Sequence, residues 1–325
     1  MNFYYEKDAL NHELGKYLYN KYKGENWEII ENHNNIEKFR NMENKEFPNL
    51  KKKIIVGIRK THVYRENHKS SDFLVPYTSS GCTASCLYCY LVCNYNKCAY
   101  LRLFVNREEM LNKIIKTSNK SDRELTFEIG SNSDLILENI YTNNLVWTIE
   151  EFAKNNWGYL TFPTKFHQVD ALLNLKHGGK TIIRVSFNPE KIIKEIELGT
   201  SSLKKRVGAI NKLCDAGYKI GIIIAPIILL PDYKKLYEEL FIYLKNNLSK
   251  KVISEMFIEV IFMSYSYIHR MINTDAFNKD LYDKNLMTGT GKKYYYKKDI
   301  KEEAQSFIEN KLNTIFDNPN ILYIV

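Results

Sequence analysis

The chain has 325 residues, 44% of them hydrophobic, which excludes a disordered protein and allows one large α/β domain. No apolar run reaches the roughly 18 residues of a membrane-spanning helix, and the first residues lack the layout of a signal peptide. We therefore expect a cytoplasmic protein without a membrane segment. The formal net charge of +9 suits a polyanionic partner such as nucleic acid, although an AT-rich genome would also enrich lysine and tyrosine.

The first 70 residues predict mixed structure ahead of the main domain. Residues 12–19 continue an amphipathic helical pattern. One face of this helix would carry Leu10, Leu14, Tyr17 and Leu18. A short strand is predicted over residues 54–58, and the extended segment 74–77 then leads into a cysteine-rich loop.

Cys82, Cys86 and Cys89 form this loop with the spacing C-x₃-C-x₂-C. Three thiolates this close can bind three irons of a cubane iron–sulfur cluster. A fourth cysteine at ferredoxin spacing is missing, which is the arrangement of radical S-adenosylmethionine (SAM) enzymes, where SAM binds the free iron. Tyr88 fits the same pattern. A zinc knuckle is the alternative, but zinc usually requires a second C-x₂-C pair, which the sequence lacks.

Alternating strands and helices after the loop predict a parallel sheet built from βα units. Strands are expected at residues 125–129, 159–162, 181–187, 220–225 and 256–262. Helices are expected at residues 107–116, 145–155, 203–216 and 233–248. Catalytic and binding residues of such a sheet lie at the carboxyl ends of its strands. Four polar motifs at these ends would form an active-site rim: residues 130–134, 164–167, 186–188 and 225–226.

The last stretch predicts a hairpin followed by a helix over residues 299–315. Glycines framed by strand-forming residues suggest a hairpin whose arm carries Lys292, Lys293 and Tyr294. We therefore expect three parts: an N-terminal α/β extension (1–70), a partial barrel (71–265) and a C-terminal hairpin and helix segment (266–325) that binds substrate or DNA.

Together these motifs resemble the spore photoproduct lyase family over nearly the whole chain. The similar stretches are residues 56–61, 86–91, 100–102, 164–167, 199–206 and 225–227. The resemblance implies a partial (β/α)₆ radical SAM barrel with a 4Fe-4S cluster and SAM as cofactors. Members of this family cleave SAM reductively to a 5′-deoxyadenosyl radical, which takes a hydrogen from a thymine dimer in DNA, the spore photoproduct. The dimer then fragments into two thymines, and a cysteine returns a hydrogen.

The resemblance also implies partners and site residues. Partners would be damaged double-stranded DNA, held by a basic face, and an electron donor such as flavodoxin or ferredoxin; we expect a monomer. Cys82, Cys86 and Cys89 would bind the cluster. Five residues would lie around SAM: Tyr90, Ser133, Lys165, Ser186 and Ala225. Lys165 is the strongest on independent grounds, because an ammonium near the SAM carboxylate or ribose is a sensible contact. His167 is a weaker candidate.

Two positions depart from the family. Its hydrogen-donor cysteine corresponds to Ser131, whose O–H bond is too strong to give a hydrogen atom readily to a carbon radical. The candidate donors are then Cys98, Cys93, Tyr88 and Tyr90, with Cys98 preferred over Cys93; Cys214, inside a predicted helix, should only pack. The Arg-Tyr pair of the family's DNA-binding hairpin corresponds to Met287 and Thr288, which leaves Lys292, Lys293 and Tyr294 for phosphate and base contacts.

Three functions stay open at this point. The first is a lyase that repairs thymine dimers. The second is a related radical SAM enzyme acting on another nucleic acid, nucleotide or peptide, which the serine at position 131 favours. The third is a cluster-bearing nucleic-acid-binding protein without turnover, against which the rim residues Ser133, Lys165 and Ser186 argue.

Overall fold

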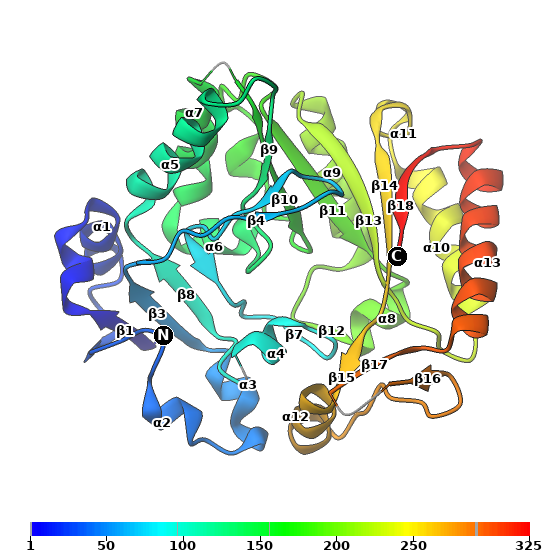
Figure 1. Ribbon diagram of the computed structural model, residues 1–325, viewed down its shortest axis with the longest axis horizontal. Coiled ribbons are helices and arrows are strands. Elements are labelled where there is room, and N and C mark those ends of the chain that lie inside the picture. Colours follow the sequence, from blue (N-terminus) through cyan, green and yellow to red (C-terminus); the bar gives the residue numbers. More distant parts are fainter. Residues whose placement is uncertain (1, 96, 156, 290–291) are drawn as a thin grey trace.

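The computed structural model describes residues 2–95, 97–155, 157–289 and 292–325. Its largest element is an eight-stranded sheet in the order β18-β14-β13-β11-β10-β9-β5-β4, which curls around the centre of the molecule (Figure 1). Neighbours from β5 to β18 pair in parallel, and β4 pairs antiparallel with β5. The strands are β4 (Arg65–Glu66), β5 (Phe73–Leu74), β9 (Thr126–Glu128), β10 (Tyr159–Thr164), β11 (Thr181–Phe187), β13 (Lys219–Ile227), β14 (Phe257–Phe262) and β18 (Asn320–Ile324). This curved parallel sheet confirms the predicted partial barrel.

Most of the longer helices cover the outside of the curled sheet, whereas α12 (Tyr267–Phe277) and the short helices α2, α3 and α4 lie below it in the view of Figure 1. The longer ones are α5 (Arg107–Asn119), α6 (Leu135–Thr142), α7 (Asn144–Ala153), α9 (Leu203–Asp215), α10 (Tyr233–Asn247), α12 (Tyr267–Phe277) and α13 (Lys298–Phe316). The shorter ones are α2 (Glu37–Arg40), α3 (Phe47–Leu50), α4 (Leu91–Tyr95), α8 (Glu190–Glu195) and α11 (Lys250–Glu255). None of the helices in the described part of the chain is long and apolar enough to cross a membrane.

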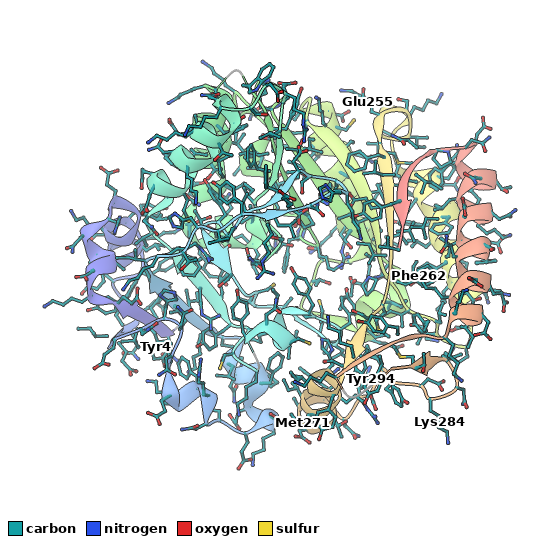
Figure 2. The ribbon with its side chains drawn as sticks, in the orientation of Figure 1. Tyr4, Glu255, Phe262, Met271, Lys284 and Tyr294 are labelled. Carbon is teal, nitrogen blue, oxygen red and sulfur yellow. The ribbon has the colours of Figure 1, made fainter. Side chains whose placement is uncertain are left out.

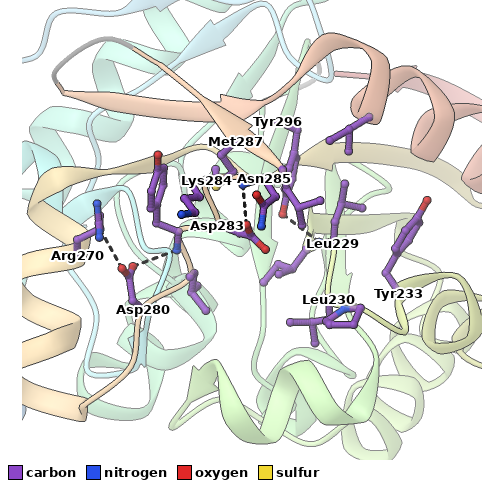
Figure 3. Close-up of a pocket in the computed structure, with 16 residues that line it drawn as sticks. Leu229, Leu230, Tyr233, Arg270, Asp280, Asp283, Lys284, Asn285, Met287 and Tyr296 are labelled. Atoms are coloured by element: carbon purple, nitrogen blue, oxygen red, sulfur yellow. Dashed lines mark hydrogen bonds and ion pairs between the residues drawn. The ribbon is translucent and has the colours of Figure 1, made fainter.

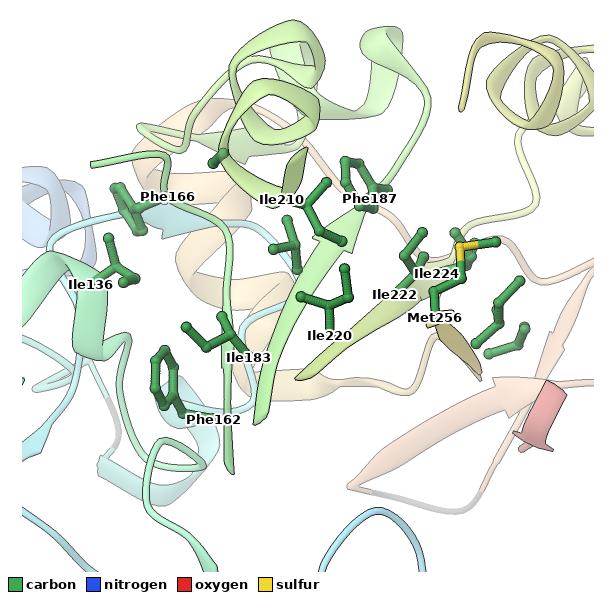
Figure 4. Packing of buried hydrophobic residues seen from close by; sticks show 14 of the residues in the cluster. Ile136, Phe162, Phe166, Ile183, Phe187, Ile210, Ile220, Ile222, Ile224 and Met256 are labelled. Atoms are coloured by element: carbon green, nitrogen blue, oxygen red, sulfur yellow. The ribbon is translucent and has the colours of Figure 1, made fainter. Parts of the chain in front are cut away.

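Strand β11 shows how the sequence separates core from site. Successive side chains of a strand point to opposite faces. Ile183 and Phe187 are fully buried on the outer face, beside Ile210 of α9 (Figure 4). Arg184 and Ser186 alternate with them and therefore face the inside of the barrel, where both line a cavity. The same period-two pattern on β13 and β14 puts aliphatic side chains outside and site residues inside.

A second, five-stranded sheet lies beside the first in the order β2-β1-β3-β8-β6. Its strands are β1 (Asn2–Glu6), β2 (Asn26–Ile30), β3 (Lys53–Gly57), β6 (Ser79–Ser80) and β8 (Leu101–Phe104). The sheets cross the predicted part boundaries, because β8 follows residue 70 yet pairs with β3, and β18 follows residue 265 yet pairs with β14. The division at 70 and 265 thus does not follow the sheets and stays a prediction.

Helix α1 (Glu13–Lys21) packs on this second sheet, with one correction to the expected face. Leu14 and Leu18 are buried, but Tyr17 is 44% exposed. Gly15 is buried too, which turns the buried stripe of the helix away from Tyr17. Leu10 lies before α1, in a short 3₁₀ helix (Lys7–Asn11).

Two small sheets complete the fold. β7 (Ser85–Cys86) of the cysteine loop pairs antiparallel with β12 (Glu197–Leu198). β15 (Tyr265–Ser266), β17 (Lys293–Tyr296) and β16 (Met287–Thr288) form the other sheet, and β16 and β17 are the arms of the predicted hairpin. Residues 290 and 291 of its tip lie outside the described residues.

Candidate active site

A cavity of about 440 Å³ opens at the carboxyl ends of the parallel strands. The cysteine loop lines one side of it, and the rest of the lining comes from the parallel strands β5, β9, β10, β11, β13, β14 and β18 and from loops beside them. The structure brings residues of all four predicted rim motifs to this cavity: Ser131, Ser133, Lys165, Ser186 and Ala225. Four motifs that are far apart in the chain therefore meet in one place, as expected for a barrel active site.

Cys82, Cys86 and Cys89 all line the cavity. Burial raises the pKa of the Cys82 thiol to about 12, and it raises the pKa of Cys86 well above its ordinary value. Among the described residues, no three cysteine, histidine or acidic side chains are grouped closely enough to hold a single metal ion. A zinc site needs such a group, whereas a cubane cluster spreads its thiolates over separate irons. The three cysteines therefore fit an iron–sulfur cluster better than a zinc ion.

Glu197 connects the cysteine loop with the rim through hydrogen bonds and ion pairs. It is fully buried and accepts hydrogen bonds from the Tyr88 hydroxyl, from Asn188 Nδ2 at 2.9 Å and from Arg206 Nη2 at 2.6 Å. The Lys165 ammonium lies 3.3 Å from its carboxylate. Burial alone would raise the pKa of Glu197, but the charges of Arg206 and Lys165 hold that pKa to about 2. The carboxylate is therefore an ionised anchor at neutral pH.

Three of the residues predicted to bind SAM are linked by hydrogen bonds on the rim. Lys165 Nζ donates to Ser186 Oγ at 2.5 Å and to the Ala225 carbonyl at 2.9 Å. Ser186 Oγ also donates to the Ala225 carbonyl, at 3.1 Å. The Lys165 side chain is 22% exposed, so the ammonium is fixed in direction and still open to a polar ligand in the cavity.

Ser133 belongs to a second bonded group on the same rim. Its hydroxyl forms a hydrogen bond with the Ser79 hydroxyl, which donates to Glu138 at 2.5 Å. The next residue, Asp134, caps α6 by accepting from the Leu137 amide at 3.2 Å. These hydrogen bonds hold the loop that follows β9 against β6 and against the start of α6.

The candidate hydrogen donors are separated by the structure. Tyr88 and Tyr90 line the cavity, as does Ser131, and Tyr90 is half exposed at 51%. Cys98 is 4% exposed and packs in a different core cluster, which also contains Phe39, Leu50, Ile55 and Tyr100. This contradicts the preference for Cys98, because a side chain buried in another core cannot reach a carbon radical in the cavity.

Cys93 is also turned away from the cavity. Its sulfur lies 3.2 Å from Ser266 Oγ and within 3.9 Å of both ring nitrogens of His269. His269 is buried and contacts the Cys89 carbonyl at 3.0 Å. Cys93 thus faces α12 and β15, and this placement argues against direct hydrogen donation. Cys214 is fully buried inside α9, as expected for a packing residue.

His167 follows Lys165 but takes no part in the cavity lining. Its ring nitrogen Nδ1 lies 2.7 Å from the Ser201 hydroxyl, which also accepts from the His167 amide at 3.1 Å. Ser201 belongs to the loop between β12 and α9. His167 therefore ties two loops together beside the site.

Sequence analysis missed a charged group on the inner face of the barrel. Arg184 forms ion pairs with Glu128 at 2.6 Å and with Glu259 at 3.1 Å, and all three line the cavity. Burial disfavours the charge, but the two carboxylates raise the pKa of Arg184. The available signal was a charged residue inside an apolar strand, as in residues 181–187 and 257–262.

The hairpin lies outside this cavity. Lys292 and Lys293 are exposed, while the Tyr294 ring packs against Tyr282 with 4.5 Å between centroids. In Figure 2, Tyr294 lies beside α12 at the lower edge of the molecule, below Phe262 at the end of β14.

A second cavity, of about 740 Å³, lies under the hairpin (Figure 3). Arg270 and Asp280 pair at 2.9 Å on one side of it, and Tyr233 lines the other. Its remaining lining is largely apolar and includes Leu229, Leu230, Leu286, Met287 and Tyr296. The cysteine loop takes no part in this lining, so the two cavities are separate.

Comparisons with known proteins agree with this geometry. The family model described as spore photoproduct lyase matches residues 1–325. The chain is 33% identical over 334 residues to the spore photoproduct lyase of Bacillus subtilis, covering 98% of this chain and 96% of that protein. It is 30% identical over 340 residues to that of Clostridium acetobutylicum, covering 99% and 97%.

Solved structures give the same result. A spore photoproduct lyase complexed with dinucleoside spore photoproduct superimposes with a TM-score of 0.91 at 28% identity, covering 99% of this chain and 98% of that one. A double mutant with bound AdoMet and dinucleoside spore photoproduct also gives a TM-score of 0.91, at 29% identity and the same coverage.

Proposed function

Because the chain belongs to the spore photoproduct lyase family, we propose that it is a radical SAM lyase that reverses spore photoproduct in DNA. Cys82, Cys86 and Cys89 would hold a 4Fe-4S cluster, and reductive cleavage of SAM there would supply a 5′-deoxyadenosyl radical that takes a hydrogen from the methylene bridge of the dimer. The bridge bond would then break to give one thymine and a thymine carbon radical, and the return of one hydrogen atom would convert that radical into the second thymine. The observation that carries the proposal is one cavity lined both by the three cysteines and by the bonded Lys165 group.

The residues of the chain have separate tasks in this proposal. Lys165 and Ser186 would hold the polar end of SAM, since both present polar atoms fixed by the Ala225 carbonyl. Tyr90 and Ser133 would complete the SAM site from the cysteine loop and from the loop after β9. The apolar wall of the cavity would exclude water from the reacting centre.

Among the four candidate donors we favour Tyr90 for the return of hydrogen. It lines the cavity and is half exposed, whereas the Tyr88 hydroxyl is bonded to Glu197. Tyr90 would give the hydrogen atom of its phenol to the thymine carbon radical and would become a phenoxyl radical. One electron from the external donor and one proton from solvent would restore it. Replacing Tyr90 by Phe should then leave SAM cleavage in place and lower the yield of repaired thymines.

The partners follow from the same proposal. The substrate would be double-stranded DNA that carries the lesion, with Lys292, Lys293 and Tyr294 of the hairpin contacting phosphate and base. A low-potential one-electron protein such as flavodoxin or ferredoxin would supply the electron. We further expect a monomer that works in the cytoplasm.

The test uses anaerobically reconstituted protein with SAM, dithionite and dinucleoside spore photoproduct. Thymine dinucleotide and 5′-deoxyadenosine are followed together, with a Cys86→Ala variant as the control without a complete ligand set. Thymine product that requires all three cysteines supports the lyase. Formation of 5′-deoxyadenosine without thymine product would contradict it and would point to the alternative substrate class of nucleic acid, nucleotide or peptide.

A further inference from the structure

A buried lysine lies directly behind the first cysteine of the loop. Lys51 follows α3, and only 3% of its surface is exposed. Its ammonium donates hydrogen bonds to the Cys82 carbonyl at 2.8 Å and to the Ala99 carbonyl at 2.7 Å. The Cys82 amide also donates to the Ala99 carbonyl, at 3.3 Å. The ammonium therefore lies where the two ends of the segment 82–99, which contains all three cluster cysteines, come together.

Among the residues that the structure describes, none gives the charge of Lys51 a carboxylate partner. Within the described part of the chain, no acidic side chain lies within ion-pair distance of its ammonium, and its other neighbour is the Phe47 ring at 5.2 Å. By contrast, Lys165 and Arg206, on the other side of the loop, share the carboxylate of Glu197. A buried charge is costly unless an opposite charge lies near. An anionic cluster on Cys82, Cys86 and Cys89 would supply that opposite charge.

We propose that Lys51 raises the reduction potential of the cluster and so eases delivery of the electron that SAM cleavage requires. A cubane with three thiolates is anionic both before and after it accepts one electron from the external donor, and reduction adds one further negative charge. A fixed positive charge in a buried site stabilises the more negative state more strongly. This inference requires that the cluster binds, but it does not depend on which substrate the enzyme repairs.

A purely structural role for Lys51 would be to hold the two ends of the segment 82–99 together by its hydrogen bonds to the Cys82 and Ala99 carbonyls. Charge and hydrogen bonding can be separated by a matched pair of variants. Lys51→Gln keeps a neutral amide donor and loses the charge, whereas Lys51→Arg keeps both the charge and the donors. Lys52→Gln is the control, because Lys52 is the exposed neighbour and its charge is solvated.

The experiment is a redox titration of the reconstituted variants, followed by electron paramagnetic resonance of the reduced cluster. We expect Lys51→Gln to lower the ratio of reduced to oxidised cluster at a fixed solution potential by about tenfold, a shift of about 59 mV for a one-electron couple. Lys51→Arg and Lys52→Gln should keep the potential of the unchanged protein.

Each outcome bears on the proposal. A Lys51→Gln protein that holds a full cluster with an unchanged reduction potential would overturn the proposal. Lys51 would then have only the structural role. If Lys51→Gln fails to assemble a cluster, iron and sulfide contents of the two variants decide. Assembly by Lys51→Arg alone would support a requirement for the charge, and equal failure of both would again overturn the proposal. Because thymine product is not measured, a failed lyase assignment would show in a different assay.

Discussion

Side chains of the rim beside the cysteine loop form ion pairs and hydrogen bonds with one another inside the barrel, whereas the two lysines near the tip of the C-terminal hairpin project to the surface. Glu197, Lys165 and Arg206 are held by buried ion pairs, and each of them has several hydrogen bonds. Lys292 and Lys293 of the hairpin are exposed.

This difference sets the expected cost of a substitution in each of the two regions. In a buried charge network, a change in one member leaves another charge without a partner, at a cost of several kcal/mol. The exposed residues Lys292 and Lys293 of the hairpin tolerate change at small cost, because water replaces a lost contact, whereas Met287 is 2% exposed and packs in the core. Lys165 and Ser186 of the rim keep the family pattern and Ser131 departs from it, while Met287 and Thr288 of the hairpin are the predicted counterparts of the family's Arg-Tyr pair.

The largest effect should come from the three cysteines of the cysteine loop. Cys86→Ala removes one thiolate, and no other cysteine lines the cavity among the described residues except Cys82 and Cys89. We expect loss of the cluster and of all 5′-deoxyadenosine formation, measured by iron content and by product analysis. Cys214→Ala, in the core of α9, is the control and should keep the cluster. A Cys86→Ala protein with full iron content would contradict the assignment.

The next largest effect should come from Glu197. Glu197→Ala leaves the charges of Arg206 and Lys165 unpaired in the interior, which should lower the free energy of unfolding by about 3–5 kcal/mol. Urea unfolding of the protein measures this, with Glu195→Ala, an exposed neighbour, as the control. A loss equal to that of the control would show that Glu197 is not the anchor of the rim.

Glu197 also gives stability a pH dependence with a defined sign. Its pKa in the folded protein is about 2, below the ordinary value of 4.5, because Arg206 and Lys165 outweigh burial. A carboxyl with a lowered pKa stabilises the fold above pH 4.5 and loses that contribution as the pH falls toward 2, here about 3 kcal/mol. In Glu197→Gln, the free energy of unfolding should depend less on pH between pH 6 and 3, which is roughly the range of this titration. An unchanged slope in this variant would contradict the lowered pKa.

A smaller effect should come from a thiol at position 131 of the rim. Ser131 lines the cavity, and Ser131→Cys would place a weak S–H bond at the position that the sequence resemblance assigns to the family's hydrogen donor. We expect several-fold faster formation of thymine dinucleotide from dinucleoside spore photoproduct. Ser254→Cys, on the exposed end of α11, controls for an added thiol outside the cavity. Equal rates for both variants would mean that hydrogen return does not limit the reaction.

The sequence predicts local features of this molecule well and long-range ones poorly. The cysteine spacing, the rim motifs and strands such as β11 and β13 were predictable because each depends on a few consecutive residues. Strand β18 was missed, because its five residues lie 58 positions beyond β14, and only tertiary pairing places them in the sheet. Pairing of β8 with β3 was missed for the same reason.

Side-chain direction was the other limit on prediction. Cys93 and Cys98 both follow the cysteine loop closely in sequence, but the chain turns at α4 and neither of them lines the cavity. Lys51 and Glu197 each gave too little signal, because a lone Lys or Glu usually indicates a solvated surface. Their burial depends on the carbonyls and charges that the fold brings to them.

The smallest effect should come from the hairpin. Replacing Lys292 and Lys293 together by Ala should weaken binding to lesion-bearing duplex DNA a few-fold, and it should reduce the salt dependence of log K by roughly one unit for each lost phosphate contact. Repair of the dinucleoside substrate should stay unchanged, because neither lysine lines the cavity. Lys120→Ala is the control, since that exposed residue precedes β9 at the opposite end of the strands. Equal loss of duplex and dinucleoside repair would show that the hairpin supports the cavity itself, and the contrast between a bonded rim and a free hairpin would then be wrong.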